Sequence, residues 1–299
     1  MKKYGEQNFS SIWIKFNDYQ AVQIDEKTYI TPKETAKKEI YDPFDKSDKI
    51  LVDILRIGRL IEQDDNLNAN KEVLEFVKNY GLLGEMTYLP LNNNIIEQDK
   101  VYLPKNNLIL QKEVLSVTEY ISEFLKCDTK HKIKIEKELD DSISVTTKDE
   151  VNSLIALDMP LEFSIVFSKV YSECMVWIMH YAYTLYRTFD AIENYYKQED
   201  DYAKQMKSIL IKEFKASNIA CRVLVGNKPT DKPVLEWNFN SLKQAIDVMF
   251  ALNETTERKT VKGCKHCGNP FHSENLKAEY CSPQCRNKAN VYKTRARKK

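Results

Sequence analysis

Glycine and histidine are both scarce in this chain. Seven glycines occur in 299 residues, and none of the glycine-rich loops that cradle phosphates is present. The sequence also contains no G-x-S-x-G or H-E-x-x-H motif and no His and Glu pattern of a zinc deaminase. Four histidines provide few candidates for general-base or metal catalysis. The sequence thus carries no catalytic signature, which favours a role other than an enzyme.

Long hydrophobic runs are absent as well. The longest stretch without Asp, Glu, Lys or Arg covers residues 174–186, well short of the roughly 18 to 20 residues that cross a bilayer. His180 lies in this stretch, where a hydrogen-bonded core or groove histidine is a simpler interpretation than a catalytic one. Because no signal peptide precedes the chain, we expect a cytoplasmic protein without membrane contact.

Hydrophobic patterning predicts an α+β fold. A predominantly helical body with small β-hairpin elements is expected over residues 1–256, with a β subregion within residues 1–45, followed by a zinc finger over residues 257–299. The chain is long enough for one large domain or two medium ones. Apolar residues spaced three and four apart predict helices over 46–63, 70–79, 106–126, 160–197 and 241–252. Residues 220–225 and 234–239 are predicted to be the two strands of a hairpin. Residues 253–260 form a polar link that is either mobile or pinned.

Four cysteines near the C-terminus form the most informative pattern in the chain. Cys264 and Cys267 are spaced C-x2-C, and Cys281 and Cys285 are spaced C-x3-C. Two such pairs supply the four sulfur ligands of a tetrahedral, structural Zn²⁺ site with no open position for water. Gly268 suits a sharp turn beside the first pair. In the second pair, Ser282 is a good helix cap and Pro283 a good first helical residue, which places Cys285 in the first turn.

Other uses of these cysteines remain open. Four cysteines form two disulfides in some proteins, although Cys127, Cys174 and Cys221 bring the total to an odd seven. His266 and His272 lie near enough in sequence to replace one thiolate in a Cys3His site. Asp140-Asp141 and Glu199-Asp200-Asp201 are acidic clusters that resemble Mg²⁺ ligands, but adjacent side chains on a surface diverge, so solvated charge is favoured there.

Basic residues are concentrated around and after the cysteines. Residues 258–299 contain twelve Lys or Arg and two Glu, whereas the first 257 residues contain 33 basic and 42 acidic residues. Such asymmetry indicates a polyanionic partner at the basic end. Residues 286–299 contain neither Gly nor Pro and should form a helix on which Ala289, Val291 and Tyr292 pack against the finger. The alternative is a solvated basic terminus. The candidate nucleic-acid-binding residues are Arg286, Asn287, Lys288, Asn290, Lys293, Arg295 and Arg297.

Residues 264–297 resemble the CGNR-type zinc finger and its relatives. The shared features are C-x2-C-G, Phe271, Tyr280-Cys281-Ser282 and Cys285-Arg286-Asn287-Lys288. The resemblance implies a treble-clef finger that ends a larger, mostly helical bacterial domain, and by analogy nucleic-acid binding and transcription regulation. The chain departs from that family around Asn287, where Arg286 and Lys288 replace the family's Gly and Arg.

Three classes of function follow from these features. The favoured one is a regulator, bacterial or from a mobile element, that binds DNA or RNA through a finger with one structural Zn²⁺. The second is a scaffold for a protein partner or a homodimer, in which zinc only stabilises the fold. The third is a nucleic-acid-directed effector or nuclease of a defence system, in which the body carries the chemistry.

Overall fold

The computed structural model describes residues 2–4, 7–9, 13–84, 100–102, 114–116, 172–195, 220–224, 234–239 and 241–296. The chain divides into two compact units. The first comprises Met1–Asp45, Leu74–Ile178 and Ala216–Ala245, and the second comprises Lys46–Val73, Met179–Lys215 and Ile246–Lys299. The segments before the cysteines therefore contribute to both units, and the cysteines themselves belong to the second.

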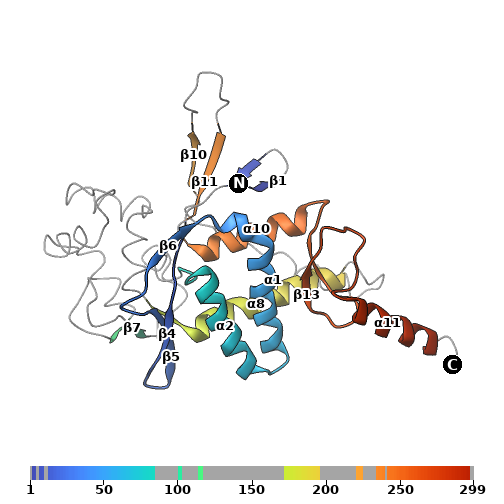
Figure 1. The fold of residues 1–299 in the computed structure, drawn as a ribbon, viewed down its shortest axis with the longest axis horizontal. Helices are drawn as coiled ribbons and strands as arrows, with labels where there is room; N and C mark the ends of the chain where they lie inside the picture. The colour runs from blue at the N-terminus through green and yellow to red at the C-terminus, as the bar shows by residue number, and fades with distance from the viewer. Residues whose placement is uncertain are drawn as a thin grey trace, which may run out of the picture. The chain divides into compact units, whose positions relative to one another are not determined.

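The first unit contains small antiparallel sheets (Figure 1). Strand β4 (Tyr19–Ile24) pairs with β5 (Lys27–Pro32), which also pairs with the short strand β9 (Glu173–Cys174). The other pairs in this unit are β1 (Lys2–Tyr4) with β2 (Gln7–Phe9), β3 (Trp13–Phe16) with β6 (Lys38–Tyr41), β7 (Lys100–Tyr102) with β8 (Val114–Ser116), and β10 (Ala220–Leu224) with β11 (Val234–Asn238). The mixture of helices and small sheets agrees with an α+β fold.

Three helices pass from one unit to the other along the chain. They are α2 (Asn66–Tyr80), α8 (Met175–Tyr195) and α10 (Leu242–Thr255). Helix α10 begins as the sequence predicts, because the backbone N–H of Gln244 donates to the Ser241 hydroxyl over 3.1 Å. In α8, His180 is exposed, so it does not lie in the core, which is one of its two predicted positions.

Helix α1 (Ser47–Glu62) follows a 3-10 turn, η1 (Pro43–Lys46), and is central to the second unit. The predicted apolar stripe is buried at Ile50, Leu51, Ile54, Leu55 and Ile57. Gly58 lies in the same helix where it meets α8, since a Cβ added at this position would lie 2.1 Å from the Ala182 carbonyl oxygen. The backbones of α1 and α8 therefore touch at a point that only glycine permits.

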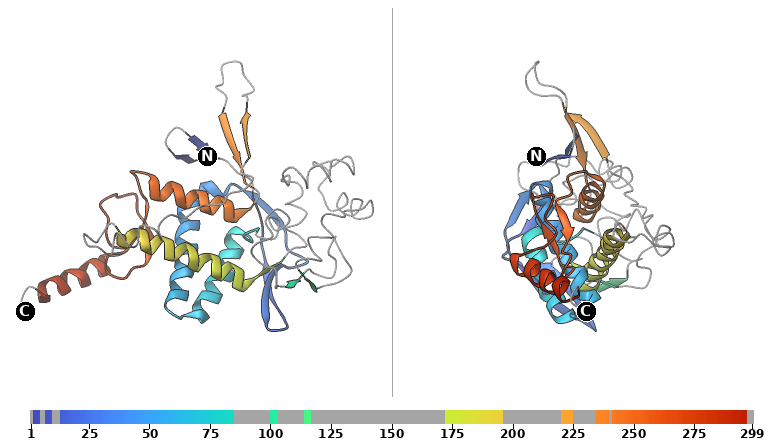
Figure 2. Two further views of the ribbon diagram at one scale, coloured as in Figure 1. Left: turned by 180° about the vertical axis from the view of Figure 1, so that it is seen from behind. Right: turned by 90° about the vertical axis from the view of Figure 1, so that its right-hand side faces the viewer.

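The second unit ends in a short hairpin and a terminal helix. Strands β12 (Val261–Gly263) and β13 (Pro270–His272) pair antiparallel, and both contact α1. Helix α11 (Pro283–Ala296) follows and extends away from the hairpin towards the C-terminus (Figures 1 and 2). Phe271 of β13 and Val261 of β12 are buried, so the hairpin has its own share of the core.

Two predicted helices differ from the structure. Within the predicted helix 106–126, residues 114–116 form strand β8, because pairing with β7 decides their conformation and apolar periodicity does not reveal it. Within the predicted helix 160–197, Cys174 belongs to strand β9, and α8 begins only at Met175. The remaining parts of these predictions, residues 106–113, 117–126, 160–171, 196 and 197, lie outside the described residues, as do Asp140-Asp141 and Glu199-Asp200-Asp201.

Candidate metal centre

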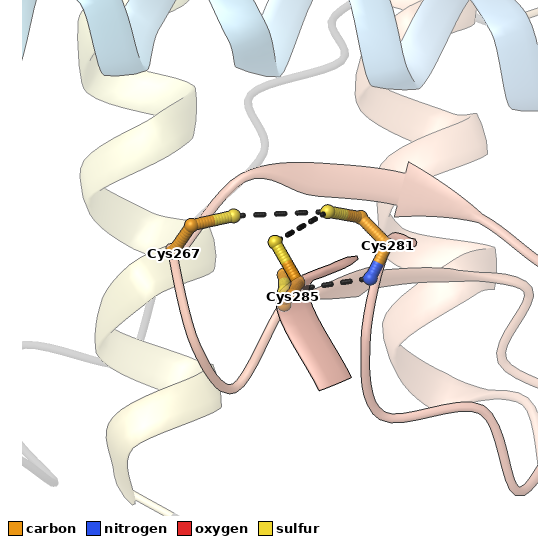
Figure 3. Close-up of side chains that lie close together, drawn as sticks. Cys267, Cys281 and Cys285 are labelled. Atoms are coloured by element: carbon orange, nitrogen blue, oxygen red, sulfur yellow. Dashed lines mark hydrogen bonds between the residues drawn. The ribbon is translucent and has the colours of Figure 1, made fainter. Parts of the chain in front are cut away.

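The four predicted cysteines lie together in space. The sulfurs of Cys264, Cys267, Cys281 and Cys285 are all within 4.8 Å of one another, and in the described part of the chain they form the one group of three or more His, Cys, Asp or Glu placed to hold a metal ion. The Cys267 sulfur lies 3.7 Å from that of Cys281, which lies 3.5 Å from that of Cys285 (Figure 3). Zinc–sulfur bonds of about 2.3 Å in a tetrahedron separate sulfurs by about 3.8 Å. The cluster therefore has the dimensions of a four-thiolate shell.

The two alternatives to a four-cysteine site receive no support from this geometry. All four cysteines are free thiols, and their sulfurs are too far apart for the roughly 2.05 Å bond of a disulfide. His266 stacks on Tyr292, and the ring nitrogen Nε2 of His272 lies 3.4 Å from a carboxylate oxygen of Asp48. Both histidines are thus engaged outside the sulfur cluster.

The first cysteine pair lies in the turn between β12 and β13. Gly268 has a φ of 72°, in the left-handed region where glycine carries no steric penalty. Its N–H donates to the carbonyl oxygen of Cys264 over 2.8 Å, and the N–H of Cys264 donates to the carbonyl oxygen of Asn269 over 2.9 Å. These bonds close a tight knuckle that turns both thiols to one side.

The second cysteine pair lies at the start of α11, where the sequence predicts it. The N–H of Cys285 donates to the Ser282 hydroxyl over 3.2 Å, and Pro283 is the first helical residue. The N–H of Cys281 points at the sulfur of Cys264, 3.4 Å away. The knuckle and the start of α11 thus lie next to each other at the sulfur cluster.

The local environment gives the thiols of Cys264 and Cys281 different pKa values. Burial raises the pKa of Cys264, but donation from the backbone of Cys281, Cys267 and His266 outweighs it and lowers the pKa to about 6. Burial and the neighbouring thiols raise the pKa of Cys281 to about 12. One thiolate therefore forms readily, whereas the accumulation of further negative charge requires a cation among the sulfurs.

Arg59 of α1 holds the knuckle from outside, and the sequence pattern does not reveal this role. Its guanidinium donates to the carbonyl oxygen of Cys267 and to the side-chain oxygen of Asn269, and it also reaches the Gln63 side chain over 3.2 Å. A planar group with five donors can serve several oxygens at once. A contact between residues 208 positions apart in sequence therefore joins the helix to the knuckle, directly behind Cys267 of the sulfur cluster.

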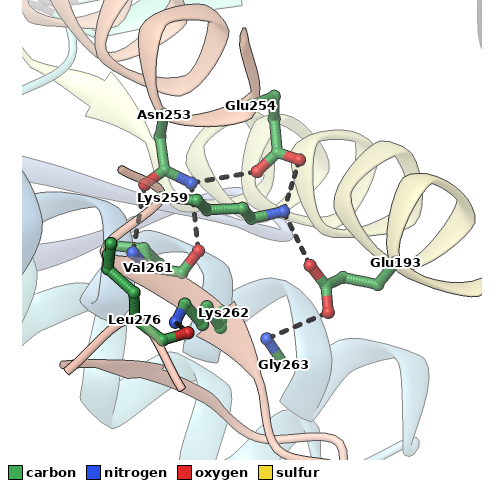
Figure 4. Close-up of polar contacts among 8 residues, drawn as sticks. All are labelled: Glu193, Asn253, Glu254, Lys259, Val261, Lys262, Gly263 and Leu276. Carbon is green, nitrogen blue, oxygen red and sulfur yellow. Dashed lines mark hydrogen bonds and ion pairs between the residues drawn. The ribbon is translucent and has the colours of Figure 1, made fainter. Parts of the chain in front are cut away.

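The polar link before the knuckle is pinned (Figure 4). The Lys259 ammonium contacts carboxylate oxygens of Glu193 and Glu254, each over 2.6 Å. Asn253 is buried, and its side chain accepts from the N–H and donates to the carbonyl oxygen of Val261, both over 3.0 Å. Thr260 donates to Asp48 of α1 over 2.9 Å. Of the two alternatives for this link, the structure shows the pinned one.

Helix α11 presents the predicted nucleic-acid-binding side chains to solvent as far as they are described. The exposed members of the predicted set are Arg286, Asn287, Lys288, Asn290 and Arg295. The side chain of Lys293 and the whole of Arg297 lie outside the description. Val291 is 48% exposed, so its predicted packing against the finger is wrong. Tyr292 is 61% exposed but stacks on His266 of the finger, so the predicted contact is made by one face of its ring only.

Comparisons with protein-family models, with curated proteins and with solved structures found no match to this chain. The resemblance to the CGNR-type finger therefore rests on residues 264–297 alone. Among the described residues, no helix is both long and apolar enough to cross a membrane. The sulfur cluster is therefore the main structural indication of function in the described part of the chain.

Proposed function

We propose that this chain binds nucleic acid through a C-terminal finger, residues 257–299, in which the four cysteines hold one structural Zn²⁺. The sulfur cluster supports this proposal most directly, because four thiols within 4.8 Å form a closed shell. A knuckle followed by a helix start is also the arrangement of a treble clef. A role in transcription regulation in the cytoplasm would suit a protein of this kind.

The charge of α11 supports nucleic acid as the partner. The helix contains no acidic residue, and Arg286, Lys288 and Arg295 are all exposed on it. Lys and Arg side chains neutralise phosphates and release condensed counterions, so the affinity of such a helix falls as salt is added. Asn287 and Asn290 are exposed beside these cations and are of the residue type that hydrogen-bonds to base edges.

A salt titration tests the proposal. Binding of fluorescent DNA and RNA would be measured by anisotropy between about 50 and 200 mM salt, for the intact protein and for an Arg286→Gln, Lys288→Gln, Arg295→Gln variant. Loss of up to three phosphate contacts should weaken binding and reduce the slope of log affinity against log salt by about 2 to 3. No binding to any probe would contradict the proposal and favour a protein-interaction scaffold.

A variant with the same loss of charge elsewhere provides the control. Lys33, Lys37 and Lys49 are exposed and lie outside the finger, so the triple substitution of these residues by Gln should leave the slope nearly unchanged. An equal loss of affinity in both variants would show that only net charge matters, and α11 would then not be the binding element.

A further inference from the structure

An aromatic pair lies on the surface beside the metal cluster. The rings of His266 and Tyr292 are stacked, with centroids 5.8 Å apart and planes 25° from parallel. His266 lies between the ligands Cys264 and Cys267, and Tyr292 lies two turns into α11. The pair therefore bridges the metal knuckle and the basic helix.

Tyr292 is much more exposed than a tyrosine whose only role is to pack in the core. Tyr292 is 61% exposed and His266 is half-buried, so most of the surface of the tyrosine is open to water. The knuckle backbone that carries His266 is held by the bond from the Gly268 N–H to the Cys264 carbonyl and by a 2.9 Å bond from the Lys265 N–H to the Glu279 carbonyl. The histidine thus supports one side of a ring whose remaining surface is open.

Cations flank the ring along its own helix face. Lys288 precedes Tyr292 by four residues and Arg295 follows it by three, and these spacings place the three side chains in one row. Both cations are exposed. An exposed aromatic ring between two cations matches a nucleic-acid strand with an unpaired base, because the base offers a flat face and its neighbouring phosphates offer negative charge. Bases inside a duplex are already stacked on one another and offer no free face.

We propose that Tyr292, supported by His266, is a stacking platform for an unpaired base, and that Lys288 and Arg295 bind the phosphates on either side of that base. The ligand is accordingly single-stranded DNA or RNA. This inference rests on the proposed function and narrows its substrate class, since duplex DNA could use the same cations but not the ring.

Substitutions at a single position separate stacking from charge. Anisotropy would be measured with single-stranded DNA and RNA of about 12 nucleotides and with the matching duplexes, for the intact protein, Tyr292→Leu and Tyr292→Phe. Tyr292→Leu removes the ring but keeps an apolar side chain suited to a helix, and should weaken single-strand binding by about 5- to 100-fold. Tyr292→Phe keeps the ring and should bind within about 2-fold of the intact protein. Duplex binding should change little in either variant.

The neighbouring residue and the cations complete the design. Val291 is 48% exposed and provides a control on the same helix. Val291→Ala should leave single-strand binding unchanged. That result would show that the loss of an apolar side chain elsewhere on α11 does not weaken binding. Single-strand binding that survives Tyr292→Leu but weakens in Lys288→Gln, Arg295→Gln would overturn the stacking platform and leave the proposed function intact. Equal loss of duplex and single-strand binding in Tyr292→Leu would also overturn it. Failure of the intact protein to bind any probe would contradict both proposals.

Discussion

Arg59 anchors the knuckle of Cys264 and Cys267 to helix α1. It is half-buried, and its guanidinium serves the carbonyl oxygen of Cys267 and the side chain of Asn269 together. Mutation of groups that hold metal ligands from behind typically lowers metal affinity by about 10- to 100-fold. Arg59 therefore has a positioning role that no spacing rule would identify, because it lies about 200 residues before the cysteines.

Arg59→Lys should weaken zinc retention without removing a ligand. A lysine keeps the charge but cannot serve two oxygens in the plane of a guanidinium, so we expect about a 10-fold loss of zinc affinity in chelator competition. Arg56→Lys is the matched control, since Arg56 is exposed, lies three residues before Arg59 in α1 and pairs with Asp53 of α1 and Glu72 of α2. Equal zinc retention in all three proteins would show that the contact does not support the metal site.

Lys259 neutralises two largely buried carboxylates, and its loss should be costly. Burial raises the pKa of Glu254, and the Lys259 charge opposes that rise. Lys259→Met should therefore destabilise the fold by about 1–3 kcal/mol at neutral pH, where the negative charges of Glu193 and Glu254 repel each other without the ammonium between them. The loss should shrink as pH falls below the ordinary carboxyl range, because both carboxyls are then protonated in the folded and unfolded states.

Urea denaturation at several pH values measures this effect. Lys265→Met is the control, because the Lys265 and Glu279 side chains are each nearly half exposed and such pairs contribute about 0–1 kcal/mol. A destabilisation by Lys259→Met that is no larger than that of the control, or that grows at low pH, would contradict the assignment.

Among the elements, helices α1 and α8 illustrate how a single small residue determines packing. Gly58→Ala improves intrinsic helix propensity by about 1 kcal/mol, yet the added methyl group would overlap the Ala182 carbonyl and the Tyr186 side chain. We therefore expect a net destabilisation of about 1–3 kcal/mol in urea denaturation. Lys49→Ala, at an exposed site in the same helix, should change stability by less than about 0.5 kcal/mol. Stabilisation by Gly58→Ala would contradict the close approach of the helices.

Local patterns predict the elements that depend on local chemistry. The stripe of α1, the cap at Ser241 and the helix start at Pro283 follow from periodicity and capping preferences, and the structure confirms them. The helical periodicity does not predict strands β8 and β9, because each forms by pairing with another strand: β8 with nearby β7, and β9 with β5 much earlier in the chain. The same reason explains why the cysteines were found and their support by Arg59 was not.

At the scale of the whole molecule, the basic finger is not an independent appendage. Its hairpin packs on α1, and Lys259 of its preceding link bonds to Glu193 of α8 and Glu254 of α10. All of these contacting residues belong to the second compact unit. Loss of the metal should therefore disturb the helices that support the finger as well as the finger itself. This coupling connects the zinc content of the protein with the behaviour of α11.

The most direct test of the central claim measures metal content and nucleic-acid binding in the same samples. The intact protein, the protein after zinc removal by a chelator, the stripped protein after return of Zn²⁺, and a Cys281→Ser, Cys285→Ser variant would be compared. We predict one zinc per intact chain, loss of binding on removal, recovery with Zn²⁺ but not Mg²⁺, and neither zinc nor binding in the variant. A protein that purifies without bound metal, or that binds nucleic acid equally well after zinc removal, would contradict the account.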